Sequence, residues 1–179
     1  TYIQNETDSL DKLINELLLL AKMENVDDIK SYEIFDVSNQ VEMCASVFES
    51  MAYEKKVKII TNIQKGIKLN GNKQDIEHIV STLLDNAIKY SSEHGMIRIT
   101  LKTSGKNKII TVRNTTDQIK KGKQDILFER FYRMDESHNS KTGGFGIGLS
   151  VVYAIVKAHK GRITARSEDG NSILFTIIL

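Results

Sequence analysis

The sequence lacks several features that would assign it to a class at once. It contains one cysteine, Cys44, so it cannot form an internal disulfide, which fits a reducing compartment. Its longest purely apolar run, LLLLA at 17–21, is far shorter than the ~20 residues that span a bilayer. Acidic and basic residues are interspersed, with a net charge of +2, so the composition carries no nucleic-acid footprint. No His/Cys cluster has zinc-binding spacing, and no Gly-x-Ser-x-Gly nucleophile turn is present.

The apolar residues of the first 24 positions recur at near-heptad spacing, which predicts one amphipathic helix whose stripe needs a partner. Because the pattern begins without a capping signal, we expect a piece of a longer helical hairpin. The alternative is an ordinary helix folded onto its own domain. A polar linker, ENVDDIKS, follows the helix. The stripe consists of Ile3, Leu10, Leu13, Ile14, Leu17, Leu18, Leu20 and Ala21.

The rest of the chain alternates between helices and mostly hairpin-linked strands, which indicates an α+β two-layer sandwich. The most periodic helix covers 73–90, and others are expected over 39–55, 124–134 and 147–160. Ser38 is a candidate N-cap for the 39–55 helix. The inward residues expected there are Val41, Cys44, Ala45, Phe48 and Met51. Strands are expected over 32–37, 57–63, 66–72, 95–104 and 107–114, with a polar loop over 115–122 and a closing hairpin over 162–179.

Asn86 lies at the edge of the apolar stripe of the 73–90 helix, with Thr82 and Tyr90 one turn before and after it. A carboxamide beside a core needs a hydrogen-bond partner, because leaving it unpaired costs roughly 1–3 kcal/mol. One interpretation is a bond to the backbone. The other is a polar line on a cleft wall, where Asn86 offers its oxygen to a hard cation such as Mg²⁺, Lys89 meets phosphate and Tyr90 packs against a base.

The segment KTGGFGIGLS, residues 141–150, places four glycines within six positions, just before an apolar helical run. Glycines let backbone amides approach anionic oxygens, and the following helix adds the positive end of its dipole. This predicts the phosphate end of an ATP site, although glycine-rich turns before helices are common. The nearby FERFYRM contains Arg130 and Arg133, which suit phosphate, and Phe128 and Phe131, which are more often core residues.

Together these segments resemble the catalytic ATP-binding domain of bacterial sensor histidine kinases, in the GHKL or Bergerat-fold group. HIVSTLLDNAIKYSS resembles the N box, LFERFYRMDESHN the F box and the start of the ATP lid, and TGGFGIGLSVVYAIVKAHKGRI the G2 box with the following helix and strand. DSLDKLINELLLLAKMEN resembles the end of the second dimerisation and phosphoacceptor helix. The resemblance implies that residues 1–30 are the end of that helix and a linker. It implies that residues 31–179 form the ATP-binding domain, a mixed sheet covered by helices.

The resemblance implies ATP and Mg²⁺ as ligands and gives the matching residues roles. Asn86 matches the asparagine that holds magnesium, and Lys89 matches a phosphate-facing lysine. Arg133 matches the lid arginine that reaches the terminal phosphate. The residues that match the phosphate cradle and the leucine packed behind it are Gly144, Gly146, Gly148 and Leu149. The residues expected on the adenine side are Tyr90, Asn114, Ile119 and Phe131.

The sequence departs from the family pattern on the adenine side. The G1 box is usually D-x-G-x-G, but here it reads NTTDQ, with Asn114, Thr116 and Gln118. Asn114 can accept a hydrogen bond from the adenine amine, but it lacks the charge that roughly doubles such a bond. A left-handed Thr116 or Gln118 would cost roughly 1–2 kcal/mol, so we expect another path for this loop and weak nucleotide binding. Thr82 stands where the N box usually has its first asparagine, and where related ATPases carry a water-activating glutamate, so fast ATP hydrolysis is not expected.

The family transfers the γ-phosphoryl group to a histidine and then to an aspartate of a response regulator, which implies an ATP-dependent protein-histidine kinase. The acceptor is missing here, because a chain without proline cannot contain the motif H-E-x-x-x-P. The four histidines are His78, His94, His138 and His159. We expect His78 and His159 to face solvent on their helices.

The partners implied are a response regulator, the protein's own phosphoacceptor helices and a second copy of the full-length protein. No nucleic acid and no direct membrane contact are expected for this part. The resemblance places it in the cytoplasmic portion of a membrane-anchored sensor. The alternative is an interaction module with a degenerate ATP site, which signals by docking without catalysis.

Overall fold

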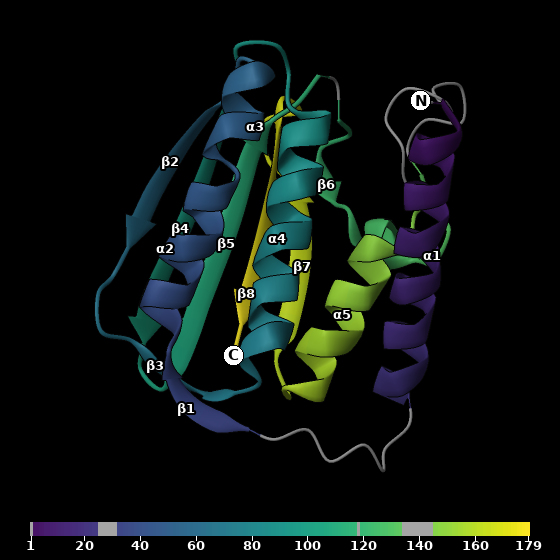
Figure 1. Ribbon diagram of the computed structural model, residues 1–179. Helices are drawn as coiled ribbons and strands as arrows, with labels where there is room; N and C mark the ends of the chain where they lie inside the picture. Colours follow the sequence, from purple (N-terminus) through teal and green to yellow (C-terminus); the bar gives the residue numbers. More distant parts are fainter. Residues whose placement is uncertain (1, 25–31, 118, 134–144) are drawn as a thin grey trace.

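The computed structural model describes residues 2–24, 32–117, 119–133 and 145–179. Helices alternate with mostly hairpin-linked strands, as the sequence predicts (Figure 1). The helices are α1 (Tyr2–Glu24), α2 (Val37–Val47), α3 (Glu49–Glu54), α4 (Lys73–Tyr90), the 3-10 turn η1 (Asp125–Phe128) and α5 (Gly148–Ala158). The strands are β1 (Glu33–Asp36), β2 (Lys58–Ile63), β3 (Lys68–Gly71), β4 (Met96–Ser104), β5 (Asn107–Thr115), β6 (Gly122–Lys123), β7 (Arg162–Ser167) and β8 (Ser172–Ile178).

Six strands form one mixed sheet in the order β2-β4-β5-β8-β7-β6. β2 pairs parallel with β4, and the other pairs in this sheet are antiparallel. β1 and β3 form a separate two-stranded sheet. α2, α4 and α5 cover one face of the six-stranded sheet, which gives two layers (Figure 1). The predicted α+β sandwich is confirmed.

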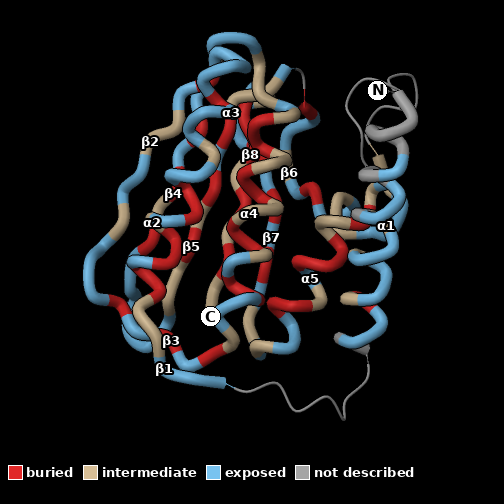
Figure 2. Tube along the Cα trace, in the orientation of Figure 1, coloured by how far each residue is buried: buried red, intermediate tan, exposed pale blue. Residues whose placement is uncertain are grey.

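The core lies between the sheet and its helices, as the buried inner sides of both show (Figure 2). In β4, Ile97, Ile99 and Leu101 are buried, whereas Arg98 and Lys102 are exposed. This alternation is typical of a sheet with one solvated face. α4 spans the predicted 73–90, because its apolar stripe and the N-cap of Asn72 both mark its length. Its fully buried residues are Ile76, Ile79, Val80, Leu83 and Leu84.

The single helix predicted over 39–55 is wrong, because the chain forms two helices that meet at Phe48. The N–H of Phe48 donates to the Ala45 carbonyl at 3.1 Å, a tighter turn than an α-helix makes. The break rotates the second helix, so Met51 is 45% exposed and Ala52 takes the inward position at 1%. The apolar spacing alone could not reveal this rotation.

The prediction that Ser38 caps α2 is wrong. Asp36 is the cap, and its carboxylate accepts the N–H of Asn39 at 3.0 Å. The Ser38 hydroxyl is buried instead, where it donates to the Gln64 carbonyl at 2.7 Å and accepts the N–H of Ile67 at 2.9 Å. The hydroxyl therefore holds the turn between β2 and β3 against α2.

The helix predicted over 124–134 is limited to the 3-10 turn η1, and the polar loop before it contributes the short strand β6. The N–H of Glu129 donates to the Ile126 carbonyl, after which the chain takes extended angles. Phe131 then adopts φ 63°, a left-handed conformation that helices exclude. The aromatic and arginine residues of FERFYRM therefore lie largely on a turn.

α1 packs beside α5 at the edge of the helical layer (Figure 1). Leu20 is buried at 5% exposure, and Leu13 and Leu19 pack partly against the core. The helix thus folds onto its own domain, the alternative that the sequence left open. A second row stays 41–56% exposed, namely Leu10, Ile14, Leu17 and Leu18. Among the described helices, none has the length and apolarity that crossing a membrane requires.

The prediction that His159 faces solvent is wrong, because its side chain is only 3% exposed. Its Nε2 accepts the N–H of Asn72 at 3.2 Å, which places the ring proton on Nδ1, 2.9 Å from the Ile155 carbonyl. The ring stacks on Tyr32 with centroids 4.9 Å apart. Because Asn72 caps α4, His159 joins the end of α5 to the start of α4. His78 is half-buried on α4.

We predict that His159→Phe lowers the free energy of unfolding by roughly 1–3 kcal/mol in urea denaturation, because it keeps the stacked ring but leaves the half-buried N–H of Asn72 without its acceptor. Tyr32→Phe is the matched control, since it removes an exposed hydroxyl that donates to the Ala158 carbonyl at 3.2 Å. We expect the control to lose less than about 1 kcal/mol. Equal losses in the two variants would contradict the structural role assigned to His159.

Candidate functional site

The candidate site lies where α4 meets the start of α5. Thr82 of α4 contacts Gly148, since a Cβ built on Gly148 would lie 3.2 Å from the Thr82 methyl group. Asn86 follows Thr82 by four residues and therefore lies on the same edge of α4, one turn further along. The polar edge of α4 and the glycine-rich segment, 60 residues apart in sequence, are thus neighbours in space, as the sequence predicts. The distance in sequence is that between Asn86 and Gly146.

Asn86 is half-buried, and its carboxamide makes no hydrogen bond to another described residue. Of the two interpretations of the sequence, the bond to the backbone is therefore not observed. Within the described ranges, no group of three or more His, Cys, Asp or Glu side chains could hold a metal ion. A single amide oxygen beside an anion-binding turn still fits Mg²⁺, which is usually held by one or two protein ligands together with phosphates and waters.

Gly146 forms a turn that only glycine fits. Its φ is 72°, and a Cβ there would lie 2.7 Å from the Tyr132 carbonyl oxygen and 2.8 Å from the Phe131 carbonyl carbon. The Gly146 carbonyl accepts the N–H of Phe131 at 2.9 Å. The turn therefore packs directly on the backbone after η1. Gly144 lies outside the described residues.

The first turn of α5 supplies backbone donors. Ile147, its N-cap, is buried at 1% exposure and has no side-chain oxygen to accept them. The first intrahelical bond starts at the N–H of Val151, which reaches the Ile147 carbonyl, so the preceding amides have no acceptor within the helix. Gly148 has no side chain to cover this turn, and Leu149 packs partly against the core behind it. Such a helix start suits a phosphate.

Lys89 and Tyr90 end α4. The Nζ of Lys89 lies 2.8 Å from a carboxylate oxygen of Asp85, and the two side chains are 26% and 23% exposed. Asp85 thereby orients Lys89 one turn beyond Asn86. Tyr90 is 47% exposed. The sequence analysis did not identify Asp85, although its spacing of four residues from Lys89 predicts an ion pair on the helix.

On the predicted adenine side, Asn114 is 1% exposed and its amide donates to the Thr115 carbonyl at 3.0 Å. Ile119 is also buried, at 6%. Thr116 avoids the left-handed conformation, as expected, and its N–H donates to the Asn171 carbonyl at 2.9 Å. Gln118 lies outside the described residues. The segment thus follows the turn between β7 and β8.

Asp169 holds that turn. Its carboxylate accepts the N–H of Asn171 at 2.9 Å and the hydroxyl of Ser172, and these bonds lower the pKa of Asp169 to about 2. Arg113 donates to the same carboxylate at 2.9 Å. The sequence reading missed Asp169, although D-G-N between strands signals a turn.

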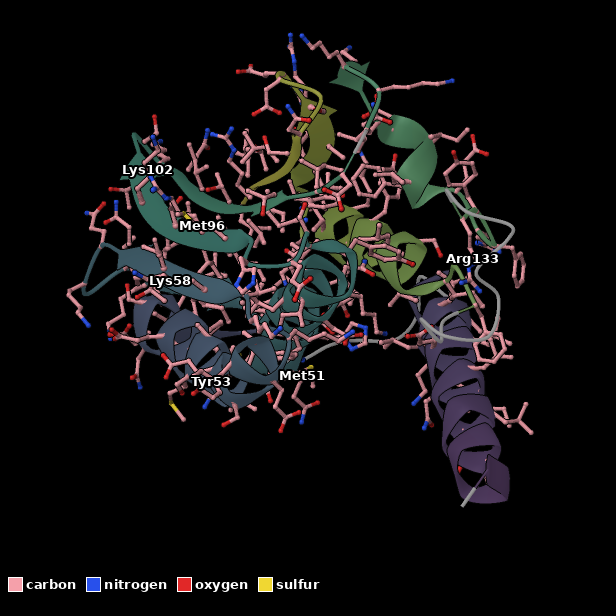
Figure 3. The ribbon with its side chains drawn as sticks, turned by 90° about the horizontal axis from the view of Figure 1, so that it is seen from above. Met51, Tyr53, Lys58, Met96, Lys102 and Arg133 are labelled. Atoms are coloured by element: carbon pink, nitrogen blue, oxygen red, sulfur yellow. The ribbon has the colours of Figure 1, made fainter. Side chains whose placement is uncertain are left out.

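Arg133 lies on the side of the molecule where α5 and α1 meet, away from Met51 and Lys58 (Figure 3). It is half-buried, and it follows Phe131, which is 65% exposed. Phe131 flanks the Gly146 turn, since its N–H donates to the Gly146 carbonyl, and Arg133 lies two residues further along the chain. Glu16 of α1 also reaches this region, with Oε1 3.6 Å from the position of a Cβ on Gly148. No sequence signal linked Glu16 to the glycines.

Comparison with known proteins matches residues 71–179 to the family model of histidine kinase-, DNA gyrase B-, and HSP90-like ATPases. The chain is 32% identical over 178 residues to the sensor histidine kinase RppB of Synechocystis sp., which covers 99% of this chain and 39% of RppB. It is 35% identical over 170 residues to the sensor protein DltS of Streptococcus agalactiae, covering 93% of this chain and 42% of DltS. The chain therefore spans about two fifths of the length of these curated relatives.

Among solved structures, the histidine kinase AdeS of Acinetobacter baumannii is similar to this chain. The TM-score is 0.81 and the sequence identity 29%, with 99% of this chain and 81% of the AdeS chain covered. The similarity includes α1 as well as the sandwich, because nearly the whole chain superposes.

We predict that Gly146→Ala destabilises the fold more than Gly105→Ala. Both glycines have similar positive φ values, 72° and 60°, so a side chain strains both backbones. A Cβ at Gly105 meets nothing within 4 Å, whereas at Gly146 it meets backbone at 2.7 Å. We expect Gly105→Ala to cost roughly 1–2 kcal/mol in chemical denaturation and Gly146→Ala clearly more. Equal costs would show that the close packing of this turn on residues 131–132 is not required.

Proposed function

Because the chain belongs to the family of histidine kinase-, DNA gyrase B-, and HSP90-like ATPases, we propose that it binds Mg-ATP as the catalytic part of a two-component sensor histidine kinase. The observation that carries the proposal is the contact between Thr82 and Gly148. It supports the proposal because the unbonded carboxamide of Asn86 lies one turn beyond Thr82, and the amide donors of α5 begin at Gly148. A carboxamide and a row of amides are complementary to a magnesium–triphosphate.

The phosphate end of the site is formed by backbone and by three side chains. Backbone N–H groups at Gly144, Gly146 and Gly148 would donate hydrogen bonds to phosphate oxygens. Asn86 would hold the metal, Lys89 would neutralise charge beside it, and Arg133 would bind the terminal phosphate. Mg-ATP, when bound, supplies the phosphoryl group for in-line transfer, a reaction that depends on positioning and charge stabilisation.

The base end is formed by less polar groups. Tyr90 offers an exposed ring at the end of α4, and Phe131 offers one at the turn after η1. Ile119 supplies an apolar wall. Asn114 keeps its carboxamide oxygen for the adenine amine, since its NH₂ group is bonded to the Thr115 carbonyl.

The histidine that accepts the phosphoryl group lies outside this sequence. We propose that residues 1–30 are the end of a dimerisation and phosphoacceptor helix with its linker, and that residues 31–179 are the catalytic domain. The acceptor then belongs to the preceding helices, and a response-regulator aspartate receives the group from it. In the full-length protein this part lies in the cytoplasm below a membrane-anchored sensor.

The exposed row of α1 supports dimerisation. Leu10, Ile14, Leu17 and Ala21 follow spacings of four, three and four residues, the seam of a coiled coil. All four are exposed. The seam therefore faces away from the domain, where the matching helix of a second copy can pack against it.

The second candidate is an interaction module without catalysis. The adenine side favours it, because Asn114 replaces a carboxylate and the 115–119 segment is bonded to the β7–β8 turn. Such a module would keep the fold and the dimer seam but not the response to nucleotide. The melting temperature with and without millimolar Mg-ATP separates the two, since ligand at 100 times its Kd stabilises by about 2.7 kcal/mol. No shift would favour the module.

We predict that Asn86→Ala lowers the affinity for Mg-ATP at least about 10-fold in calorimetric titration, the effect of losing one charge-assisted contact. The loss should disappear when EDTA replaces Mg²⁺, because Asn86 acts through the metal. Asn39→Ala, an exposed asparagine on α2, is the control and should bind as the wild type does. Unchanged affinity in Asn86→Ala would contradict the magnesium role.

We predict that Leu17→Asp converts a dimer of this chain to monomer in sedimentation equilibrium, because it places a charge in the centre of the seam. Asn15→Asp is the matched control, since it adds the same carboxylate at an exposed position outside the seam. The control should remain dimeric. A wild type that stays monomeric at hundreds of micromolar would rule out association through this segment alone.

A further inference from the structure

The docked face of α1 contains a carboxylate where packing alone would favour an apolar residue. Leu13, Glu16 and Leu20 follow one another at three and four residues, so they share one side of the helix. Leu20 is buried, and Leu13 and Glu16 are half-buried. The other acidic residue of this segment with a described side chain, Asp11, is exposed. Glu16 therefore lies between two leucines that contact the domain.

Glu16 faces the start of α5. Its Oε1 lies 3.6 Å from the position of a Cβ on Gly148, and the Thr82 methyl lies 3.2 Å from the same position. α1, α4 and α5 thus meet at one residue that has no side chain. Glu16 is held there by packing on both sides, because Leu13 lies one turn before it and Leu20 one turn after.

The start of α5 is a positive region, since its first amides lack intrahelical acceptors and the helix dipole ends there. A carboxylate beside it is stabilised in the same way as a bound phosphate. Two anions at this helix start repel each other, so the carboxylate of Glu16 and a phosphate bound at the amides beside Gly148 disfavour one another. The position of Glu16 therefore couples α1 to whatever anion the site binds.

We propose that Glu16 is an internal competitor for the phosphates of ATP, so that docking of α1 on α5 and binding of Mg-ATP oppose each other. The proposal rests on the function proposed above and adds regulation to that site. Coupling of this kind is reciprocal: α1 lowers the affinity for nucleotide by the factor by which nucleotide loosens α1. Movement of the dimerisation helix would then change nucleotide occupancy without touching a nucleotide ligand.

Calorimetric titration of the whole chain with Mg-ATP tests the competition. Glu16→Gln keeps the size of the side chain and removes its charge, so we expect about 5-fold tighter binding or more, the lower end of typical couplings. Asp11→Asn makes the same change of net charge on the exposed side of α1 and should bind as the wild type does. The comparison separates a local effect from a general reduction of negative charge.

The outcomes distinguish the inference from the function on which it rests. If neither the wild type nor either variant binds Mg-ATP, the proposed function fails. If all bind with equal affinity, the function stands and the competition by Glu16 is overturned. Equal gains in Glu16→Gln and Asp11→Asn would also overturn it, because the effect would then be general.

Hydrogen–deuterium exchange provides the reciprocal measurement. Saturating Mg-ATP should increase exchange of the wild-type amides over 13–21 in α1, because the nucleotide displaces Glu16 and loosens the helix. The same addition should change these amides less in Glu16→Gln. Unchanged exchange in a wild type that binds Mg-ATP would show that α1 and the nucleotide are independent.

Discussion

The close approach of α4 and α5 at Gly148 is the constraint on which the site depends. Residue 148 has no side chain, so the Thr82 methyl can lie against the first turn of α5. A Cβ there would lie 3.2 Å from that methyl group, so a side chain requires a shift of a few tenths of an ångström. Such a shift would also move the amides of α5 relative to Asn86, one turn beyond Thr82. Helix packing and site geometry are thus fixed by the same contact.

Strong periodicity explains what the sequence predicted well. α4 was predicted to the residue from its long apolar stripe, and the structure adds that Asn72 caps its first turn. The strands of the main sheet alternate clearly enough to predict the sandwich. The pairing of Asn86 with the glycine segment came from the chemistry of the two segments and from the resemblance, not from periodicity.

The sequence could not predict features that depend on long-range contacts. His159 is a polar residue at the end of an apolar helix, a position that predicts an exposed ring. The ring is buried because it contacts Asn72 and Tyr32, which lie 87 and 127 residues earlier in the sequence. The rotation at Phe48 leaves the apolar spacing intact. Glu16 looks like one of several charges on an amphipathic helix. Its position at Gly148 follows only from the way α1 docks.

The two ends of the site are held by different means, and this difference sets how the site responds to α1. The proposed phosphate end lies at the start of α5, where Ile147 is buried, whereas the proposed base end follows a segment bonded to the turn that Asp169 organises. In that segment the N–H of Thr116 donates to the Asn171 carbonyl and the N–H of Ile119 to the Gly170 carbonyl, and Thr116 avoids left-handed strain. A base contact without a carboxylate contributes less to binding, which leaves more of the affinity to the phosphate end. An internal anion lowers the affinity by the same factor with or without a strong base contact, but a weaker site is further from saturation at a given nucleotide concentration, so its occupancy changes more. With the competition proposed for Glu16, the altered base side and this carboxylate act in the same direction, toward a site whose occupancy depends on where α1 lies.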